Sequence, residues 1–395
     1  MKVVVGGVLS LAPFSPGTAW DRLHYVLGLR MLGHEVVFVE EVAPELCVDS
    51  EGRPCDFDRS VNRNTFITTM SRFGLLGSAC QIYDEGRATA GLSMTELKTA
   101  IAGADLLINI SGHVKSEVVL EHVGRRAYLD QDPVYTQLWD VAYGVDLGLD
   151  RHEVLFTVGA NVGSAASSVP DGGRVWHRCL PPVLLDEWRF AFDPTARRFT
   201  TVSSWGRYAD LSYGSRSYRS KRDEFMRFRM LPARVAAEFE LALRREQSDE
   251  EAVSRLAASG WTVRSAAEVA DLDRYRRFIA RSRAEIAVAK GAYVTGRVGW
   301  LGDRSSHYLA SGKPVLAQST GLERVLPTGR GLLTFSTLEE AVAGAEAIDS
   351  EYEAHCRSAR RLAERYLAHD VVLAAMLETA MSAKTAKPRP PVVAL

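Results

Sequence analysis

The sequence contains few cysteines and no excess of charge of either sign. Its five cysteines are spread over 395 residues without a Cys-x-x-Cys pair, which fits neither a disulfide framework nor a zinc site and favours a reducing, cytoplasmic compartment. Lys and Arg number 48, against 49 Asp and Glu. Because nucleic-acid binding depends on an excess of cations that meet phosphates, this balance predicts no nucleic-acid partner.

Long apolar runs are also absent. No stretch reaches the roughly 18 uninterrupted apolar residues of a membrane-spanning helix, and the apolar stretch after Met1 is too short for a signal peptide. The sequence therefore predicts no membrane span. With 46% hydrophobic residues, a chain of this length is expected to form about two domains, each with its own core.

Apolar strands alternate with helical segments in the first part of the chain. Continuous apolar runs predict strands at 2–5, 35–40, 105–110, 126–130 and 154–158. A helix is predicted over 21–32, because Gly33 follows its last periodic apolar residue. Strands that are apolar on both faces indicate a parallel sheet covered by helices on both sides.

The second part of the chain repeats this alternation. Strands are predicted at 199–205, 285–288 and 314–317, and helices at 221–246, 304–311, 337–347 and 351–382. The predicted fold class is α/β, with two doubly wound domains over 1–190 and 191–350. The helices at 351–382 follow them, and a proline-containing tail at 383–395 is expected to be mobile.

Small and polar residues follow the predicted strands of the first domain. In an open α/β sheet, ligands bind at the carboxyl ends of the strands. The residues expected to face one crevice are therefore Ser111, Gly112, His113, Asp130, Asp132 and Asn161.

The stretch 297–321 has features of an anion site. Asp303 is suited to cap the helix that follows, which places Ser305 and Ser306 in its first turn, where backbone N–H groups are unpaired. Such a helix start is suited to a diphosphate, although an ordinary capped helix would have the same sequence. Thr320 and Gly321 end the next strand with small residues that allow a ligand to approach.

Several motifs resemble the GT-B fold glycosyltransferases. The turn 311–315, Ser-Gly-Lys-Pro-Val, and the strand 331–333, Gly-Leu-Leu, resemble their nucleotide-sugar-binding half. The loop at 17–18 and the segment 32–36, Leu-Gly-His-Glu-Val, are similar to their acceptor half. The segment 129–133, Leu-Asp-Gln-Asp-Pro, resembles a group of bacterial glycosyltransferases.

This resemblance implies two facing Rossmann-like domains, with the last helices crossing back over the hinge. It also implies a nucleoside-diphosphate sugar as co-substrate, no cofactor, and a small-molecule or lipid acceptor, such as a natural product. The expected protein is a monomer or homodimer. By the resemblance, the donor contacts are Gly17, Thr18, Asp303, Ser305, Ser306, His307, Thr320, Gly321 and Glu323.

Two of these positions depart from the family pattern. His307 stands where many members have a glutamate that binds the ribose, and Glu323 is a substitute for it. Thr18 is close to the position of the usual catalytic histidine, so that base is missing. Lys290 and Arg297 are candidates to neutralise the diphosphate, with Lys221 a weaker one. A solvated surface cation is an equal alternative for Lys290 and Arg297 and the favoured interpretation for Lys221.

Four residues are candidates for the proton-accepting group. Asp130 and Asp132 stand at a strand end, where two close carboxylates can raise one pKa, but Asp-Gln-Asp-Pro is also typical of a turn. His113 follows another strand, and His24 lies on the first helix beside Asp21. The Asp-x-Asp spacing does not by itself predict a metal, and we expect none.

The candidate acceptor contacts are Phe14, Trp20, Tyr135 and Gln137, each of which would also fit a core or turn position. Two other functions stay open. A sugar-nucleotide epimerase would use the same cleft without an acceptor. A catalytically silent binding protein would explain the missing glutamate and histidine.

Overall fold

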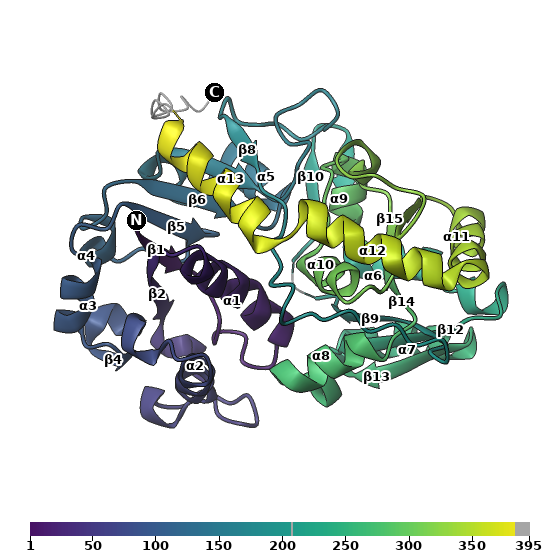
Figure 1. Ribbon diagram of the computed structural model, residues 1–395, viewed down its shortest axis with the longest axis horizontal. Coiled ribbons are helices and arrows are strands. Elements are labelled where there is room, and N and C mark those ends of the chain that lie inside the picture. The colour runs from purple at the N-terminus through teal and green to yellow at the C-terminus, as the bar shows by residue number, and fades with distance from the viewer. Residues whose placement is uncertain (207, 384–395) are drawn as a thin grey trace.

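The computed structural model describes residues 1–206 and 208–383, in which two sheets lie in two halves of the molecule (Figure 1). The strands of the N-terminal half form a sheet in the order β4-β3-β2-β1-β5-β6-β7-β8. All neighbours are parallel except β3 and β4. The bounds are β1 Lys2–Gly6, β2 Glu35–Val42, β3 Ala79–Tyr83, β4 Ala88–Gly91, β5 Leu106–Ile110, β6 Arg126–Asp130, β7 Val154–Thr157 and β8 Trp176–Arg178.

The C-terminal half contains a parallel sheet in the order β13-β12-β9-β14-β15-β16. In both sheets the first strand, β1 or β9, lies in the middle. Later strands are added first on one side of it and then on the other. This is the doubly wound topology predicted from the sequence. The bounds are β9 Arg198–Ser204, β12 Glu238–Arg244, β13 Trp261–Ser265, β14 Ala284–Ala287, β15 Val315–Gln318 and β16 Leu332–Phe335, with a separate hairpin of β10 Leu211–Tyr213 and β11 Arg216–Tyr218.

Helices cover both sheets. The helices of the N-terminal half are α1 Pro16–Met31, α2 Val61–Arg72, α3 Met94–Ile101, α4 Glu117–Leu120 and α5 Tyr135–Val141. Those of the C-terminal half are α6 Lys221–Arg227, α7 Glu250–Ala258, α8 Leu272–Ala280, α9 Gly291–Gly296, α10 Asp303–Ala310 and α11 Leu338–Ser350. The last two helices are α12 Tyr352–Tyr366 and α13 His369–Ser382.

The central position of β1 in its sheet explains why the sequence of this strand is continuously apolar. Val3 and Val5 belong to one hydrophobic cluster together with Trp20 of α1, and Val4 belongs to another with Leu97 of α3. Both faces of the strand are therefore buried, as predicted. Helix α1 begins at Pro16, earlier than predicted, because the proline is accommodated at the first helical position.

The last helices connect the two halves. Helix α12 lies along the C-terminal half, and α13 runs back over the N-terminal half, where it packs on α1 (Figure 1). Gly28 makes this packing close, since a Cβ there would lie 2.7 Å from Leu373 of α13. The crossing of the C-terminal helices agrees with the expectation from the GT-B resemblance.

The helix predicted over 221–246 is wrong in its second part. Helix α6 ends at Arg227, and residues 238–244 form the buried strand β12. The apolar residues of this strand alternate, with Phe239, Leu241 and Leu243 in one cluster. This period of two is the mark of a strand, but charged residues between them made the segment resemble a helix.

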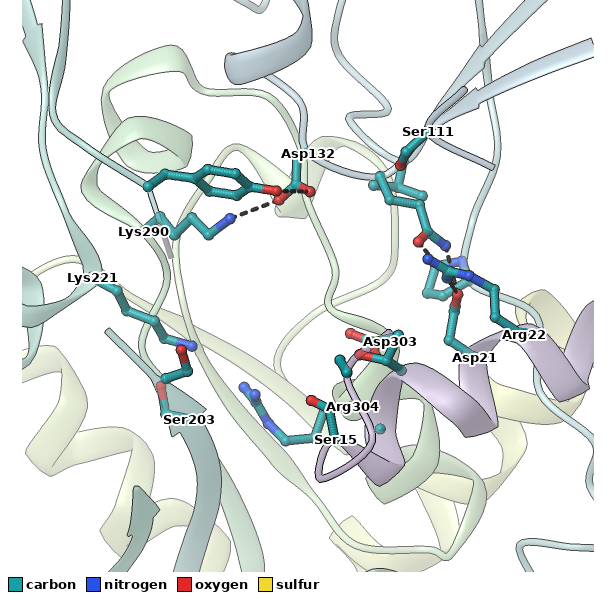
Figure 2. Close-up of a pocket in the computed structure, with 18 of the residues that line it drawn as sticks. Ser15, Asp21, Arg22, Ser111, Asp132, Ser203, Lys221, Lys290, Asp303 and Arg304 are labelled. Atoms are coloured by element: carbon teal, nitrogen blue, oxygen red, sulfur yellow. Dashed lines mark hydrogen bonds and ion pairs between the residues drawn. The ribbon is translucent and has the colours of Figure 1, made fainter. Parts of the chain in front are cut away.

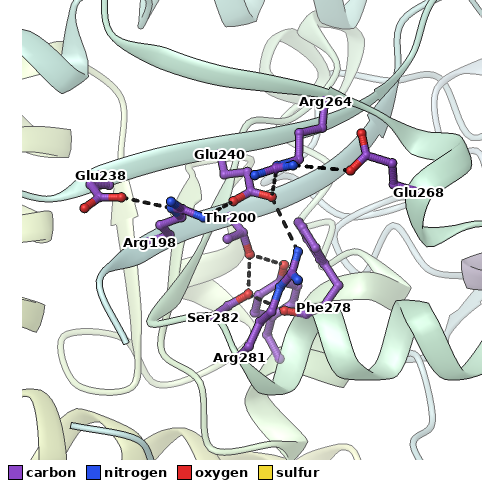
Figure 3. A network of polar contacts seen from close by, with 10 residues as sticks. Arg198, Thr200, Glu238, Glu240, Arg264, Glu268, Phe278, Arg281 and Ser282 are labelled. Carbon is purple, nitrogen blue, oxygen red and sulfur yellow. Dashed lines mark hydrogen bonds and ion pairs between the residues drawn. The ribbon is translucent and has the colours of Figure 1, made fainter. Parts of the chain in front are cut away.

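Glu240 of β12 is the charged residue that interrupts the apolar pattern of this strand. It is 1% exposed and forms ion pairs with Arg198, Arg264 and Arg281 at 3.1–3.6 Å (Figure 3). Three arginines from other elements thus compensate the burial of one carboxylate. Among the described residues, no helix is long and apolar enough to cross a membrane.

Candidate active site

A cavity of about 750 Å³ lies between the two halves. Its walls come from the carboxyl ends of strands in both sheets (Figure 2). From the N-terminal half, Ser111 follows β5 and Asp132 follows β6, while Ser203 stands at the end of β9. In both sheets, strands beside the point where the strand order reverses end at this cavity. This is the place where doubly wound folds bind ligands.

Several cations line the C-terminal wall of this cavity, among them Lys221, Lys290 and Arg304. Lys221 is the first residue of α6, Lys290 precedes α9, and Arg304 is near the start of α10. Arg304 is held in place, because its Nε donates to Glu285 at 2.5 Å and its Nη1 donates to the Val202 carbonyl at 2.7 Å. The wall is thus suited to a ligand with several negative charges.

Lys221 is largely buried, and no described carboxylate forms a direct ion pair with it, although the charges of Glu285 and Asp303 act on it from further away. It is 9% exposed, and its ammonium forms no hydrogen bond or ion pair with any residue in 1–206 or 208–383. Burial, followed by repulsion from Arg304 and Lys290, holds its pKa well below the usual value. An anion that entered the cavity would relieve this cost.

Lys290 crosses the cavity to Asp132. Its Nζ donates to Asp132 Oδ1 at 2.7 Å, and Tyr293 Oη donates to the same oxygen at 3.0 Å. Tyr208 Oη donates to Asp132 Oδ2 at 2.8 Å. The ammonium also lies 4.3 Å from the centre of the Tyr208 ring. Asp132 of the N-terminal half is thereby bound by residues of the C-terminal half.

A second polar cluster lies at the N-terminal wall. Arg22 of α1 bonds to Asp21 and, at 2.5 Å, to Gln131 Oε1, while Gln131 Nε2 donates to Asp21 at 2.7 Å. Burial raises the pKa of Asp21, with Arg22 opposing the shift. Because α1 begins at Pro16, Asp21 lies beyond the first turn of this helix.

Asp130 does not reach the cavity. It is fully buried and accepts hydrogen bonds from Thr136, Gln137, Thr157 and the Asp132 amide. Burial raises its pKa, and the three side-chain donors oppose this. All of its contacts are internal, so the paired-carboxylate prediction is corrected: Asp130 fixes the turn, and Asp132 alone faces the cavity.

His24 and His307 are buried against each other rather than in the cavity. Their Nε2 atoms lie 3.0 Å apart, and His307 stacks on Trp188 with ring centres 4.2 Å apart. Burial lowers the pKa of His24 to about 3 and that of His307 well below the usual value. The predicted roles of His24 as base and of His307 at the ribose are corrected to packing between the halves.

The start of α10 differs from the prediction. Gly302, not Asp303, is its N-cap, and Asp303 lines the cavity. Ser305 and Ser306 are at most 1% exposed and do not line the cavity, and Ser306 Oγ donates to the Asp303 carbonyl. Their hydroxyls therefore do not face the cavity, and their place near a diphosphate stays a prediction.

The other predicted donor contacts of the 297–323 region lie outside the cavity. Thr320 Oγ1 bonds to the backbone of Trp300, and Glu323 accepts from Ser319. Asn161, expected in the crevice, donates instead to the carbonyls of Arg297 and Gly321 at 3.0 and 3.1 Å. These contacts join the halves behind the cavity, which leaves Arg297, Thr320, Gly321 and Glu323 away from its walls.

The remaining predictions divide between cavity and core. Gly17, Thr18, Phe14 and His113 line the cavity. Trp20 is fully buried and donates to the Leu272 carbonyl. The other two predicted acceptor contacts are 1% exposed, where Tyr135 lies under Lys290 and Gln137 donates to Asp130.

Several lining residues were not singled out from the sequence. Tyr208, Tyr293 and Arg304 belong to this group, as do Arg244, the last residue of β12, and Glu246, which follows the strand. Arg304 directly follows Asp303, so a helix start near the cavity was the available signal. Arg244 and Glu246 were hidden by the error over β12, since a strand end there would have placed them at the crevice.

Among the described residues, no three or more His, Cys, Asp or Glu side chains are arranged to hold a metal ion. The side chains that line the cavity include ammonium, guanidinium and phenol donors. This donor set is suited to phosphate groups, because charge-assisted hydrogen bonds to phosphate are short and strong.

The two facing doubly wound halves, the shared cavity and the crossing C-terminal helices define the GT-B fold. An alpha-glucosyltransferase in complex with UDP has 10% identity to this chain at a TM-score of 0.57, covering 97% of this chain and 100% of its own. AviGT4, a glycosyltransferase involved in avilamycin A biosynthesis, has 14% identity at 0.55, covering 98% and 100%.

Anabaena HepE in complex with UDP and glucose has 10% identity at a TM-score of 0.57, covering 97% of this chain and 100% of its own. The alpha-glucosyltransferase also matches in a structure with UDP and a 13-mer DNA, at 11% identity and a TM-score of 0.59, covering 97% and 100%. No protein-family model and no curated protein sequence matches this chain. At these identities the likeness establishes the GT-B fold.

Proposed function

We propose that this protein is a glycosyltransferase that transfers a sugar from a nucleoside-diphosphate sugar to a hydroxyl group of a small-molecule acceptor. The donor binds to the C-terminal wall of the cavity and the acceptor to the N-terminal wall. UDP is the first nucleotide to test, because structures of the alpha-glucosyltransferase and of HepE contain it.

Lys221 is the observation that carries this proposal. A largely buried lysine that lines the cavity, and whose ammonium forms no hydrogen bond or ion pair with the described residues, is suited to bind an anionic ligand. Lys290 and Arg304 line the same wall, and a diphosphate gains negative charge as the bond to the sugar breaks. Fixed cations that face this developing charge stabilise the transition state.

Asp132 is the proposed proton acceptor. In the reaction, the acceptor oxygen bonds to the anomeric carbon, and the bond from that carbon to the diphosphate oxygen breaks with its electron pair on the diphosphate. The acceptor proton passes to a carboxylate within hydrogen-bond reach. Asp132 lines the cavity between the two walls, whereas the Asp130 carboxylate is occupied by internal donors.

A small-molecule acceptor suits the charges of this chain better than DNA does, although DNA is present in one neighbour's structure. The net charge is −1, while DNA binding draws on many cations that neutralise phosphates. The N-terminal wall includes Phe14, Tyr128 and Trp139, and aromatic rings of this kind pack against apolar or ring-shaped ligands.

The nucleotide is tested by calorimetry with UDP, dTDP, GDP, ADP and CDP. One of them is expected to bind the wild-type protein, with affinity lowered at least roughly tenfold in Lys221→Met, the scale of a lost charge-assisted contact. Lys115→Met is the matched control, because Lys115 lines the same cavity in the N-terminal half and should leave nucleotide affinity nearly unchanged. Equal affinities of wild type and Lys221→Met would contradict the proposed donor wall.

Metal independence is part of the proposal. Lys221, Lys290 and Arg304 supply the positive charge that a metal ion supplies elsewhere. Turnover after treatment with EDTA should equal that of the untreated enzyme. Loss of turnover that magnesium restores would contradict this part alone.

The two alternative functions give different results in the same assays. An epimerase converts the nucleotide sugar without an acceptor, so an epimer formed from enzyme and donor alone would replace the transferase proposal. A silent binding protein binds the nucleotide with no turnover in a panel of hydroxyl acceptors.

A further inference from the structure

Asp132 occupies an anion site that the opposite half of the protein builds. Its carboxylate accepts from the ammonium of Lys290 and from two phenols, at 2.7–3.0 Å. These donors, Lys290, Tyr293 and Tyr208, come from the C-terminal half, while Asp132 follows β6 of the N-terminal half. In this contact, a carboxylate of the N-terminal half is bound by three donors of the C-terminal half, Lys290, Tyr293 and Tyr208, which together are called the receptor (Figure 2).

The receptor is held in place without Asp132. Lys290 Nζ donates to Tyr293 Oη at 2.9 Å. The same ammonium lies 4.3 Å from the ring centre of Tyr208 and 5.0 Å from those of Tyr135 and Tyr293. Cation–π contacts with three rings keep the ammonium in position. An incoming anion would therefore meet a preformed set of donors.

A phosphate oxygen can replace a carboxylate oxygen in this site. Both accept charge-assisted hydrogen bonds from an ammonium and from O–H groups. Lys221 and Arg304 line the same cavity wall, and a diphosphate that spans the wall can use them together with Lys290. The Asp132 carboxylate occupies the Lys290 part of this wall.

We infer that Asp132 holds, in the free protein, the place that a phosphate of the donor takes, and that donor binding releases its carboxylate toward the acceptor. The inference rests on the proposed function. It makes the donor diphosphate a competitor of Asp132 for Lys290. It also makes the proposed base available only after the donor is bound, so the donor binds before the acceptor.

The alternative is a structural ion pair that joins the halves in every state. The two arrangements predict opposite effects of Asp132→Asn on nucleotide affinity. If Asp132 competes with the diphosphate, its neutralisation frees Lys290 and strengthens nucleotide binding. If the pair is structural, its removal loosens the cavity and weakens binding or leaves it unchanged.

The experiment is calorimetric titration of UDP, or of whichever nucleoside diphosphate binds, into the full-length chain and its variants. Asp132→Asn is expected to bind roughly fivefold more tightly than wild type, the scale of one partly buried ion pair. Its turnover should nevertheless fall, because the proposed base is lost. Lys290→Met is expected to weaken binding.

Two controls separate competition from a general effect of charge. Asp146→Asn removes a carboxylate from the same cavity, one that accepts from the Gly148 amide, and should change affinity far less. In the double variant Lys290→Met with Asp132→Asn, the gain should disappear, because the ion to be freed is absent. A gain that persists there would overturn the inference and indicate simple repulsion.

The remaining outcomes are also decisive. Equal or weaker binding of Asp132→Asn, with wild-type binding intact, overturns the inference and leaves the proposed function standing. If no nucleoside diphosphate of the panel binds to wild type or to Asp132→Asn, the proposed function fails and the inference fails with it. Melting temperatures of all variants verify that each protein is folded.

Discussion

His24 of α1 and His307 of α10 form a hydrogen bond between their Nε2 atoms, 3.0 Å apart, across the two halves of the protein. The neighbouring contacts determine its direction. The Leu184 amide donates to His24 Nδ1, so a neutral His24 carries its proton on Nε2 and donates to His307. His307 then carries its proton on Nδ1, which lies 3.2 Å from Tyr275 Oη. Both rings are neutral in this arrangement.

Acid should therefore destabilise the protein through His24. Burial lowers the pKa of His24 in the folded state to about 3 from the usual 6.5. Below pH 6.5 the unfolded chain binds a proton that the folded protein does not. The contribution of His24 to the free energy of unfolding is fully present above that pH. It falls as the pH drops toward 3, by up to about 1.4 kcal/mol per pH unit.

Denaturant unfolding of wild type, His24→Gln and His122→Gln at several pH values measures this contribution. His24→Gln should be less stable than wild type near neutral pH, because the contact is altered, but should lose less stability on acidification. The exposed His122 provides a control that keeps the wild-type slope. Identical slopes in all three proteins would contradict the neutral histidine pair.

The parts of the fold that could be predicted from sequence have local causes. The run of valines at 3–5 indicates a strand buried on both faces, and Gly33, with φ of 84°, ends α1 as predicted. Strand β12 was missed because Glu240 interrupts its apolar pattern. The arginines that compensate Glu240 come from other elements, up to 42 residues away in sequence. No local pattern shows that this charge can be buried.

The candidate site likewise depends on contacts between residues far apart in the sequence, which local patterns do not show. Lys290 and Asp132 were each predicted, as a donor contact and a base, from their positions after strands. Their ion pair joins residues 158 positions apart and depends on how the two halves pack. Ser305 and Ser306 were placed at the diphosphate because they begin a helix, but the sequence does not say which face of that helix meets the cavity.

Replacement of Lys221 should increase stability while it removes binding. The folded protein keeps the largely buried Lys221 near the charges of Arg304 and Lys290, with no direct ion pair to a described carboxylate. Lys221→Met keeps most of the apolar side chain and removes the charge. We expect its unfolding free energy to rise by about 1 kcal/mol, the usual scale where function is exchanged for stability. A lower unfolding free energy, measured by urea denaturation, would mean that Lys221 is held by contacts that favour its charge.

Nucleotide binding should take up a proton. Because burial holds the pKa of Lys221 below its usual value, the free protein loses this proton at a lower pH than a solvated lysine does, whereas a bound diphosphate stabilises the ammonium. Affinity for UDP should therefore fall as the pH rises through the range in which Lys221 of the free protein loses its proton.

Calorimetry in buffers of different ionisation enthalpy measures this proton uptake. The apparent binding enthalpy should vary with the buffer for wild type, with a slope that corresponds to proton uptake. A Lys221→Arg variant keeps the positive charge but does not titrate in this range, and any binding it retains should show no such slope. A wild-type enthalpy that is independent of the buffer would contradict a titrating Lys221.

Asp130 and Asp132, two residues apart, should respond to the same substitution in different ways. Asp130 accepts from three side-chain donors and one amide within the fold. An asparagine presents an NH₂ group to some of these donors, and an unsatisfied buried donor costs about 1–3 kcal/mol. Asp130→Asn should therefore lower the unfolding free energy by about that amount. Asp132→Asn, at the cavity wall, should change stability by less than about 1 kcal/mol while turnover falls. Urea denaturation and steady-state rates on the two variants separate these effects, and an Asp130→Asn protein of wild-type stability with no turnover would return the proton-accepting role to Asp130.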